Sequence, residues 1–263
     1  MTTLGATSIR PVAFAAALAA FAVGSTAHAT VVSGASAAYA ASVSATITLP
    51  IGPPIPISLG PIPSLSDTAP PPYNNSTSVS NITIPGILTI STLNASDSSD
   101  VDGSPGVKFA TAAASIQNLS LTLPGLTILA TFIGSDSLIN GDFGSLTRSG
   151  FTTLTGVSVN GVSVTDMPPV NDVLLDAGGL KVVLNEQTPS GDGISESDLT
   201  VNAVDITFSD FVAGLVSLNG QIILSHSFAD LAAVPSAVSE PTTLALLGAG
   251  LLGLGVIRQR KRG

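Results

Sequence analysis

Apolar and small polar residues alternate along much of this chain, and this pattern limits what the chain can fold into. In residues 42–49, apolar residues take turns with serine and threonine, and leucine does the same in residues 119–123. A period of two places one set of side chains on each face of a strand. Charged residues, which exposed helices need, make up only 10% of the chain. The sequence therefore predicts an all-β body.

Turn signals between the alternating runs divide the body into hairpins. Asn160-Gly161 separates the apolar runs at 157–159 and 162–164, and this dipeptide favours the two-residue turn of a β-hairpin. A second Asn-Gly pair within residues 218–221 predicts another hairpin of the same kind. The only soluble helix that the pattern indicates is a short turn after Ser209.

A repeat with an offset of 39 residues is visible within the body. Residues 82–87 (ITIPGI) correspond to 121–126 (LTLPGL), and the SDS sequence at 96–98 corresponds to that at 135–137. Each unit predicts a strand, a Pro-Gly turn, a second strand and an acidic loop. Because a solenoid needs about three or more repeats, the sequence favours an antiparallel β-sandwich or a flattened barrel.

Proline is concentrated in one part of the body. Residues 50–72 contain nine of the 18 prolines of the chain. Proline lacks the N–H that a sheet ladder needs, and this excludes the segment as a central strand. We expect a polyproline-like excursion along the surface.

Charge and scarce residue types exclude several classes of function. The chain has no cysteine, which excludes disulfide scaffolds and thiolate metal sites. Residues 30–239 carry 16 acidic and three basic side chains, a net charge of −13. A surface this negative repels phosphate backbones, so we do not expect nucleic acid as a partner. Cations, or polymers bridged by cations, are the expected neighbours.

The N-terminal end has the pattern of an export signal. Arg10 precedes an apolar run of 12 residues at 12–23, and Ala27-His28-Ala29 fits the A-x-A pattern of a cleavage site. Such a run is too short to cross a bilayer but suits the helical core of a signal peptide. We therefore predict a signal peptide at 1–29 and an extracellular body at 30–235.

The C-terminal end has a second apolar run. Residues 242–257 carry no charge, and a helix of this length reaches about 24 Å, close to the hydrocarbon thickness of a membrane. Basic residues after the run should stay on the cytoplasmic side. These residues are Arg258, Arg260, Lys261 and Arg262. We predict a transmembrane helix at 242–257 and an inner-membrane intermediate.

The order of these C-terminal features resembles a known sorting signal. Ser239-Glu240-Pro241-Thr242 precedes the Gly-rich apolar run and the basic end, and residues 239–263 are similar in this to a PEP-CTERM sorting domain. Ser239 stands where the family has its first proline. The resemblance implies recognition and cleavage by an exosortase, followed by transfer to the cell surface or beyond. In the family, such systems accompany exopolysaccharide production in Gram-negative bacteria. An ordinary tail anchor is the alternative.

The body resembles the choice-of-anchor P family of exported proteins. The resemblance rests on short stretches at 35–39 (ASAAY), 154–161 (LTGVSVNG), 182–187 (VVLNEQ) and 199–204 (LTVNAV). It implies a secreted β domain with a separate anchor, and it supplies no catalytic residues.

The densest group of acidic residues is a candidate calcium loop. Asp97, Asp100 and Asp102 lie close together in sequence, and a hard cation needs several oxygen ligands on a tight turn. Phe109 stands where an EF-hand loop has its last glutamate, which excludes that motif. A solvated acidic turn is the alternative, both here and at residues 192–198.

The sequence offers few residues from which a catalytic site could be formed. His226 is the only histidine after residue 29, and no G-x-S-x-G elbow is present. Sites for glycoside cleavage usually line clefts rich in aromatic side chains, and aromatic residues make up 4% of the chain. We predict that the protein is not an enzyme and needs no cofactor.

Together these observations predict an exported surface or extracellular-matrix protein with a structural or adhesive role linked to exopolysaccharide. Its expected partners are an exosortase, a surface polymer and, before processing, the membrane. The alternative is a secreted carbohydrate-binding or carbohydrate-active protein that uses the same sorting route. An exposed aromatic patch, or a carboxylate pair in a cleft, would favour this alternative.

Overall fold

The computed structural model describes residues 29–235, which form one β unit. Residues 1–28 of the predicted signal peptide lie outside the described residues. So do the predicted sorting segment, the helix at 242–257 and the basic tail. No helix among residues 29–235 is long and apolar enough to cross a membrane.

The described residues form 13 strands in chain order. They are β1 (Thr30–Thr48), β2 (Ile55–Ala69), β3 (Tyr73–Ile84), β4 (Leu88–Ser99), β5 (Lys108–Leu123), β6 (Leu126–Gly141), β7 (Thr147–Thr155), β8 (Ser158–Val159), β9 (Val162–Ser163), β10 (Asp172–Ala177), β11 (Leu180–Ser190), β12 (Glu196–Ala213) and β13 (Val216–Val234).

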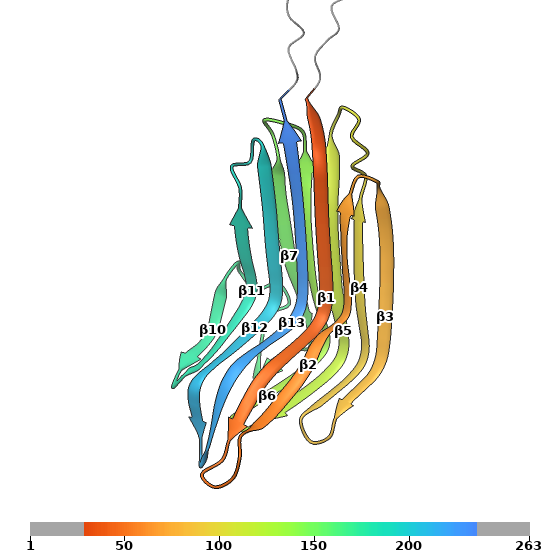
Figure 1. Ribbon diagram of the computed structural model, residues 1–263. Helices are drawn as coiled ribbons and strands as arrows, with labels where there is room; N and C mark the ends of the chain where they lie inside the picture. The colour runs from red at the N-terminus through yellow and green to blue at the C-terminus, as the bar shows by residue number, and fades with distance from the viewer. Residues whose placement is uncertain (1–28, 236–263) are drawn as a thin grey trace, which may run out of the picture. The chain divides into compact units, whose positions relative to one another are not determined.

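These strands form two antiparallel sheets. Sheet A has the order β10-β11-β12-β13-β1-β2, and sheet B has the order β3-β4-β5-β6, with β7 and the β8–β9 hairpin both paired to β6. The chain starts in sheet A, forms sheet B from β3 to β9, and returns to sheet A, where β13 pairs with β1 (Figure 1). Thr30 therefore lies opposite Val234, and the first and last residues of the β unit are neighbours at one end of sheet A.

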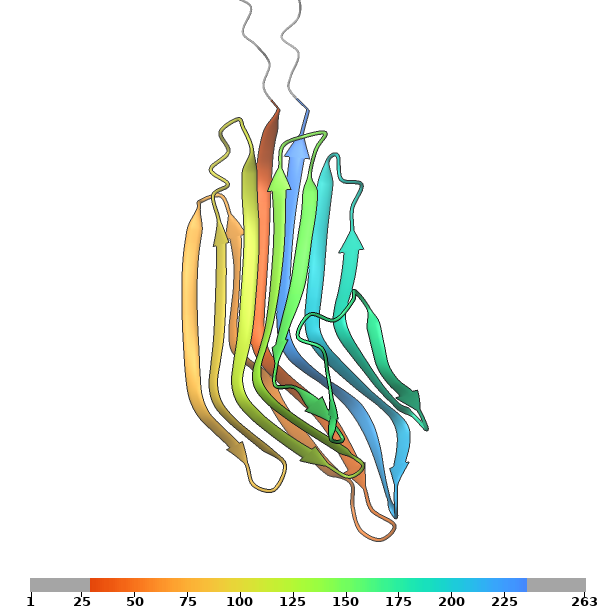
Figure 2. The same ribbon diagram turned by 180° about the vertical axis from the view of Figure 1, so that it is seen from behind.

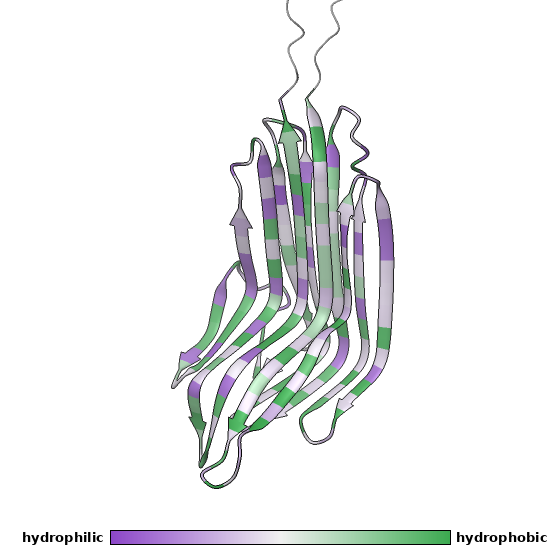
Figure 3. Ribbon diagram, viewed as in Figure 1, coloured by the Kyte–Doolittle hydropathy of each residue, from purple (hydrophilic) through white to green (hydrophobic). Residues whose placement is uncertain are grey.

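The two sheets pack face to face around an apolar interior. In sheet A, β1 and β13 lie over β4, β5 and β6 of sheet B (Figure 2). Apolar and polar residues alternate along the strands (Figure 3), so one face of each sheet is buried and the other faces solvent. The predicted all-β class is confirmed, and of the two predicted architectures the sandwich is the one that forms.

The predicted turns with Asn-Gly and Pro-Gly sequences are confirmed at three places. Asn160-Gly161 joins β8 to β9, with a φ of +50° at Asn160, which asparagine tolerates better than most residues. Pro85-Gly86 joins β3 to β4, and Pro124-Gly125 joins β5 to β6. The repeat in the sequence is thus a repeat of two adjacent hairpins in sheet B.

Other local predictions are wrong. The SDS sequences at 96–98 and 135–137 lie within β4 and β6 rather than in loops, because the ladders of both strands extend past them. Residues 218–221 lie within β13, and the hairpin turn falls at Gly214-Leu215. Gly220 is required by the close approach of β13 to β1. A Cβ at this position would lie 2.1 Å from the carbonyl oxygen of Ser44 on β1.

The segment after Ser209 is not helical. The described structure continues β12 to Ala213, and a register shift between Phe208 and Phe211 takes up the irregularity. Asp210, inside this shift, has a φ of +51°. The predicted helical turn after Ser209 is therefore a β-bulge.

The proline-rich segment is also different from the prediction. Residues 55–69 form β2, a strand that contains Pro56, Pro61 and Pro63 and whose pairing with β1 shifts register between Leu59 and Ile62. An edge strand pairs on one side only, so a missing N–H can face the unpaired side. β2 is the edge of sheet A beside β1. The prediction that this segment is not a central strand is confirmed, but the predicted polyproline-like excursion is wrong for residues 55–69, which are hydrogen-bonded to β1.

Both sheets bend along one line that crosses the strands (Figures 1 and 2). Asn118 on β5, Asn185 on β11 and Ser225 on β13 lie within the strands and have φ values of +50°, +48° and +60°. A left-handed residue disturbs the strict alternation of a strand, so the inward-facing set shifts by one position. In β13, Leu224 and Ser225 are consecutive and both are fully buried.

The bend divides the β unit into two halves with different interiors. We call the half that contains Thr30 and Val234 the small-residue half and the other the aliphatic half. Inward-facing residues of the small-residue half include Ser36, Ala38, Ala95, Ala112, Ala114, Ser135, Ser137 and Ser227. Those of the aliphatic half include Leu88, Leu121, Ile128, Leu184, Val204, Ile206 and Leu224.

Candidate functional site

The structure does not bring the residues of the predicted calcium loop together. Asp97 faces inward from β4 and is 2% exposed, and burial raises its pKa. Asp100 accepts a hydrogen bond of 2.7 Å from the backbone N–H of Phe109. Asp102 forms an ion pair of 2.7 Å with Lys108, which holds the pKa of this carboxyl well below its usual range. The three carboxylates therefore have three different environments.

A different set of carboxylates converges on the outer face of sheet A. Oxygens of Glu196 and Asp198 on β12 and of Asp230 on β13 all lie within 4.8 Å of one another. Asp198 pairs directly with Asp230. Burial, and then the charges of Asp198 and Glu196, raise the pKa of Asp230 to about 6. A set of oxygens alone is the donor type that hard cations prefer.

His226 lies in a row of side chains that crosses sheet A. Its Nδ1 lies 2.7 Å from Oδ1 of Asn202, whose Nδ2 donates to Glu186 at 2.7 Å. The ring stacks on Tyr39 with centroids 4.3 Å apart. Because Asn202 offers its oxygen, Nδ1 is the protonated nitrogen of the neutral ring. Burial lowers the pKa of His226 to about 4. Within residues 29–235 no serine hydroxyl is hydrogen-bonded to it.

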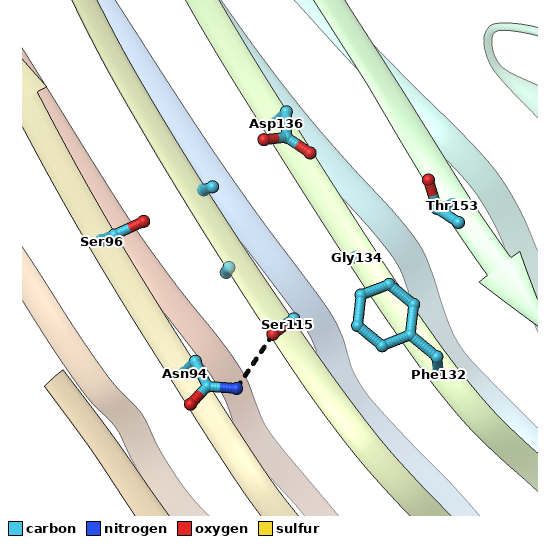
Figure 4. A pocket seen from close by; sticks show the side chains of 9 residues that line it. Asn94, Ser96, Ser115, Phe132, Gly134, Asp136 and Thr153 are labelled. Carbon is cyan, nitrogen blue, oxygen red and sulfur yellow. Dashed lines mark hydrogen bonds between the residues drawn. The ribbon is translucent and has the colours of Figure 1, made fainter. Parts of the chain in front are cut away.

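The outer face of sheet B carries a shallow depression, which we call the trough. It is lined by residues of β4, β5, β6 and β7, has a volume of about 260 Å³ and lies in the small-residue half. The register explains it. Asn94, Ser115, Gly134 and Thr153 form one row across the four strands. The glycine and the serine in the middle of the row leave the floor low between taller neighbours (Figure 4).

Phe132 forms one end of the trough. A Cβ at Gly134 would lie 2.8 Å from Cε1 of Phe132, so the ring lies over the glycine, close to the sheet surface. Figure 4 shows the ring with its face, rather than its edge, toward the viewer. Only glycine at position 134 permits this ring position.

Polar groups surround the remainder of the trough. Nδ2 of Asn94 donates a hydrogen bond of 3.1 Å to Oγ of Ser115. Asp136 lies beyond Gly134 on β6, and burial raises the pKa of its carboxyl. None of the hydrogen bonds found within residues 29–235 uses this carboxylate. Phe151, which pairs with Asp136 from β7, is 54% exposed.

Sequence reasoning missed the residues of the trough. In the sequence, Asp136 stands out only as part of the repeated SDS sequence, and Phe132 and Asn94 lie on strands whose neighbours are set by register. Asp230 was missed for the same reason, although Glu196 and Asp198 lie in the acidic stretch at 192–198. The short pattern Phe-x-Gly within β6 is the one local signal that could indicate the ring platform.

The C-terminal sorting residues lie outside the described part of the chain, and a comparison with known families addresses them. Residues 237–261 are a PEP-CTERM protein-sorting motif. This confirms the resemblance predicted from Ser239, Glu240, Pro241 and Thr242. A PEP-CTERM motif implies export, a place at the cell surface or outside the cell, and an exosortase as processing partner.

The other comparisons say little about the β unit. The sequence has no significant match among curated proteins. The crystal structure of Ail, the attachment invasion locus protein of Yersinia pestis, aligns with 75% of this chain and 97% of its own, at 7% identity and a TM-score of 0.17. A score this low carries no argument about fold or function. The resemblance of the body to the choice-of-anchor P family stays a prediction.

Proposed function

We propose that this protein is an exosortase substrate that carries its β unit to the cell surface or into the extracellular matrix. The signal peptide at 1–29 starts secretion, and the apolar run at 242–257 halts transfer with the basic tail inside. The exosortase then cuts near Ser239, Glu240 and Pro241. The observation that carries this proposal is the PEP-CTERM motif at 237–261.

The topology of the β unit supports the same route. β1 begins at Thr30 and β13 ends at Val234, and these two residues are paired neighbours. The two targeting segments are therefore joined to one end of the sandwich, and the aliphatic half is the part of the unit farthest from this end. Such a unit can fold outside the membrane while its C-terminal segment is still held there.

For the β unit itself we propose a non-enzymatic structural or adhesive role linked to exopolysaccharide. Two sheets that pack face to face around a close-packed interior are suited to a rigid spacer. The net charge of −13 over residues 30–239 keeps copies of the unit apart in solution. The second candidate is carbohydrate binding. The exposed ring of Phe151 and the ring platform of Phe132 are the observations that favour it.

The sorting route can be tested by intact mass. The protein is recovered from medium and envelope of a bacterium that has an exosortase, and of the same strain without it. We expect loss of residues 1–29 and of everything beyond the Ser239 region only where the exosortase is present. Glu240→Ala with Pro241→Ala should abolish C-terminal cutting, and Ser236→Ala, just outside the motif, should not. A full-length C-terminus in the envelope of both strains would make the segment a permanent anchor.

A further inference from the structure

The trough has the size and shape of a surface on which a chain can lie. At about 260 Å³ it falls below the range of enclosed small-molecule pockets, roughly 300–1,000 Å³. It is open along the sheet, and its floor is made of the small residues Ala113 and Ser115, beside Gly134 with the Phe132 ring over it. A ligand here would lie across the strands with one side in solvent. An extended polymer fits this geometry better than an isolated small molecule does.

The Phe132 ring supplies an apolar platform at one end of this floor. An aromatic ring held flat on a sheet loses little conformational freedom when a ligand stacks on it. Gly134 fixes the ring position by leaving room beneath it. The complementary ligand therefore has a flat apolar face of similar size, which the C–H face of a pyranose ring provides.

The polar groups around the platform match hydroxyl groups. Asp136 offers two acceptor oxygens that have no hydrogen-bond partner within residues 29–235, and a half-buried carboxylate in this state gains from a new donor. Asn94 offers an amide, and Ser96 and Thr153 offer hydroxyls. Groups that both donate and accept suit a ligand rich in hydroxyls, whose oxygens do the same.

Charge decides which polymers can approach. The trough contains one carboxylate and no lysine or arginine, and residues 30–239 carry a net charge of −13. A polyanionic chain would meet repulsion at the site and around it. A nucleic acid is excluded on the same ground. An uncharged polysaccharide meets no such barrier.

We propose that the trough binds a strand of neutral polysaccharide, with one sugar ring stacked on Phe132 and its hydroxyls bound by Asp136 and Asn94. This deepens the polymer link of the proposed function by naming the site and the class of polymer. It does not depend on sorting, because the site lies wholly in residues 94–153.

The test uses the full-length chain in detergent, so that processing plays no part. Binding of cellohexaose, laminarihexaose and maltohexaose is measured by titration calorimetry. We expect at least one of these neutral hexasaccharides to bind, and Phe132→Ala to weaken that binding by about tenfold or more. Asp136→Asn should weaken it severalfold. Leu129→Ala, an exposed apolar residue of the same strand outside the trough, should bind as the wild type does.

A second variant keeps the test decisive if Phe132→Ala does not fold. Ala113→Tyr adds a bulky, strand-compatible side chain to the floor, so it should block binding while the thermal midpoint stays near that of the wild type. No binding of any of the three hexasaccharides at about 10 mM would overturn the proposal. So would equal binding by wild type and Ala113→Tyr, or binding of polygalacturonate in place of the neutral sugars when calcium is added. Since this chain is never processed, a failed sorting assay leaves the binding result unaffected.

Discussion

The two halves of the β unit share the same strands but differ in what fills the space between the sheets. The aliphatic half is packed with leucine, isoleucine and valine, and its cluster is continuous across both sheets. The small-residue half has a middle layer of alanine and serine, in which Ser225 hydrogen-bonds both Ser135 at 3.0 Å and the carbonyl oxygen of Ala114 at 2.8 Å. A serine of one sheet can reach the backbone of the other only where the sheets approach closely.

The candidate functional groups of the β unit are concentrated in the small-residue half. The aliphatic half buries large apolar side chains, which stabilise the fold most strongly. The small-residue half holds the two chain ends, the trough and the cluster of Glu196, Asp198 and Asp230. It also holds buried hydroxyls with no partner within the described residues, such as Ser137 and Ser227. A second apolar cluster, which includes Ile139, Leu199 and Leu231, lies nearer the chain ends, so the layer of alanine and serine is packed between two apolar clusters.

The largest effect is expected from a cavity in the aliphatic half. Ile128 on β6 is fully buried in its cluster. Ile128→Ala should lower the free energy of unfolding by about 2–5 kcal/mol, because lost burial and an unfilled cavity add together. Equilibrium urea unfolding measures this. Leu129→Ala, the 48% exposed neighbour, should change it by less than about 0.5 kcal/mol. Equal effects would mean that the aliphatic interior does not carry the stability.

The fold should be destabilised in the opposite way in the small-residue half, by a larger buried side chain rather than by a smaller one. Ala114 is 4% exposed and lies where Ser225 of the other sheet contacts its carbonyl. Ala114→Leu should therefore lower the free energy of unfolding by about 1–3 kcal/mol, since the sheets must separate to admit the side chain. The matched change Ala113→Leu faces the trough and should have little effect on urea unfolding. A well-tolerated leucine at 114 would show that the sheets are not held close there.

The boundary between the halves depends on left-handed backbone, and this can be tested at Asn118. Its φ is +50° and its side chain is exposed. Asn118→Val should lower the free energy of unfolding by about 1–2 kcal/mol, because a β-branched residue is disfavoured in this conformation. Asn118→Gly should be close to neutral. The two variants are compared by thermal and urea unfolding. If valine is accepted as readily as glycine, the bend is not built on this residue.

The sequence predicted the parts of the fold that depend on neighbours in the chain. Alternation indicated the strands, and Asn160-Gly161 and the two Pro-Gly pairs indicated turns, because each acts within a few residues. The bend was not foreseen, since a single left-handed asparagine looks like any polar strand residue. Asn219-Gly220 imitated a turn because the same glycine serves a close approach between β1 and β13.

The candidate sites were predicted less well, for a related reason. Glu196 and Asp198 were noticed as an acidic stretch, but their partner Asp230 reaches them only through the register of β12 and β13. The trough combines four strands, and only the order of sheet B brings Asn94 near Phe132. The sorting motif, by contrast, is one continuous stretch of sequence, so it could be recognised without knowledge of the fold.

The smallest effect is expected from two titrating groups on β13, which lie in the small-residue half and oppose each other. The pKa of Asp230 is raised to about 6, mainly by burial, against 3.8 in the unfolded chain. The folded state therefore keeps a proton that the unfolded chain has released, and stability falls as pH rises between about 4 and 6. His226, with its pKa lowered to about 4 by burial, acts in the reverse sense. The unfolded chain takes up a proton first, and stability is lost as pH falls from 6.5 towards 4.

Asp230→Asn should separate the two contributions. It removes the unfavourable burial of a charge, so it should raise the free energy of unfolding at pH 7 by about 1 kcal/mol after allowance for solvent screening. Between pH 6 and 4 the variant should lose stability more steeply than the wild type, because the opposing contribution of Asp230 is then missing. Urea unfolding from pH 4 to 7, with EDTA present to exclude bound calcium, measures both. Asp166→Asn, an exposed carboxylate elsewhere, controls for net charge. An unchanged pH slope in Asp230→Asn would mean that burial and the neighbouring carboxylates do not raise the pKa of Asp230.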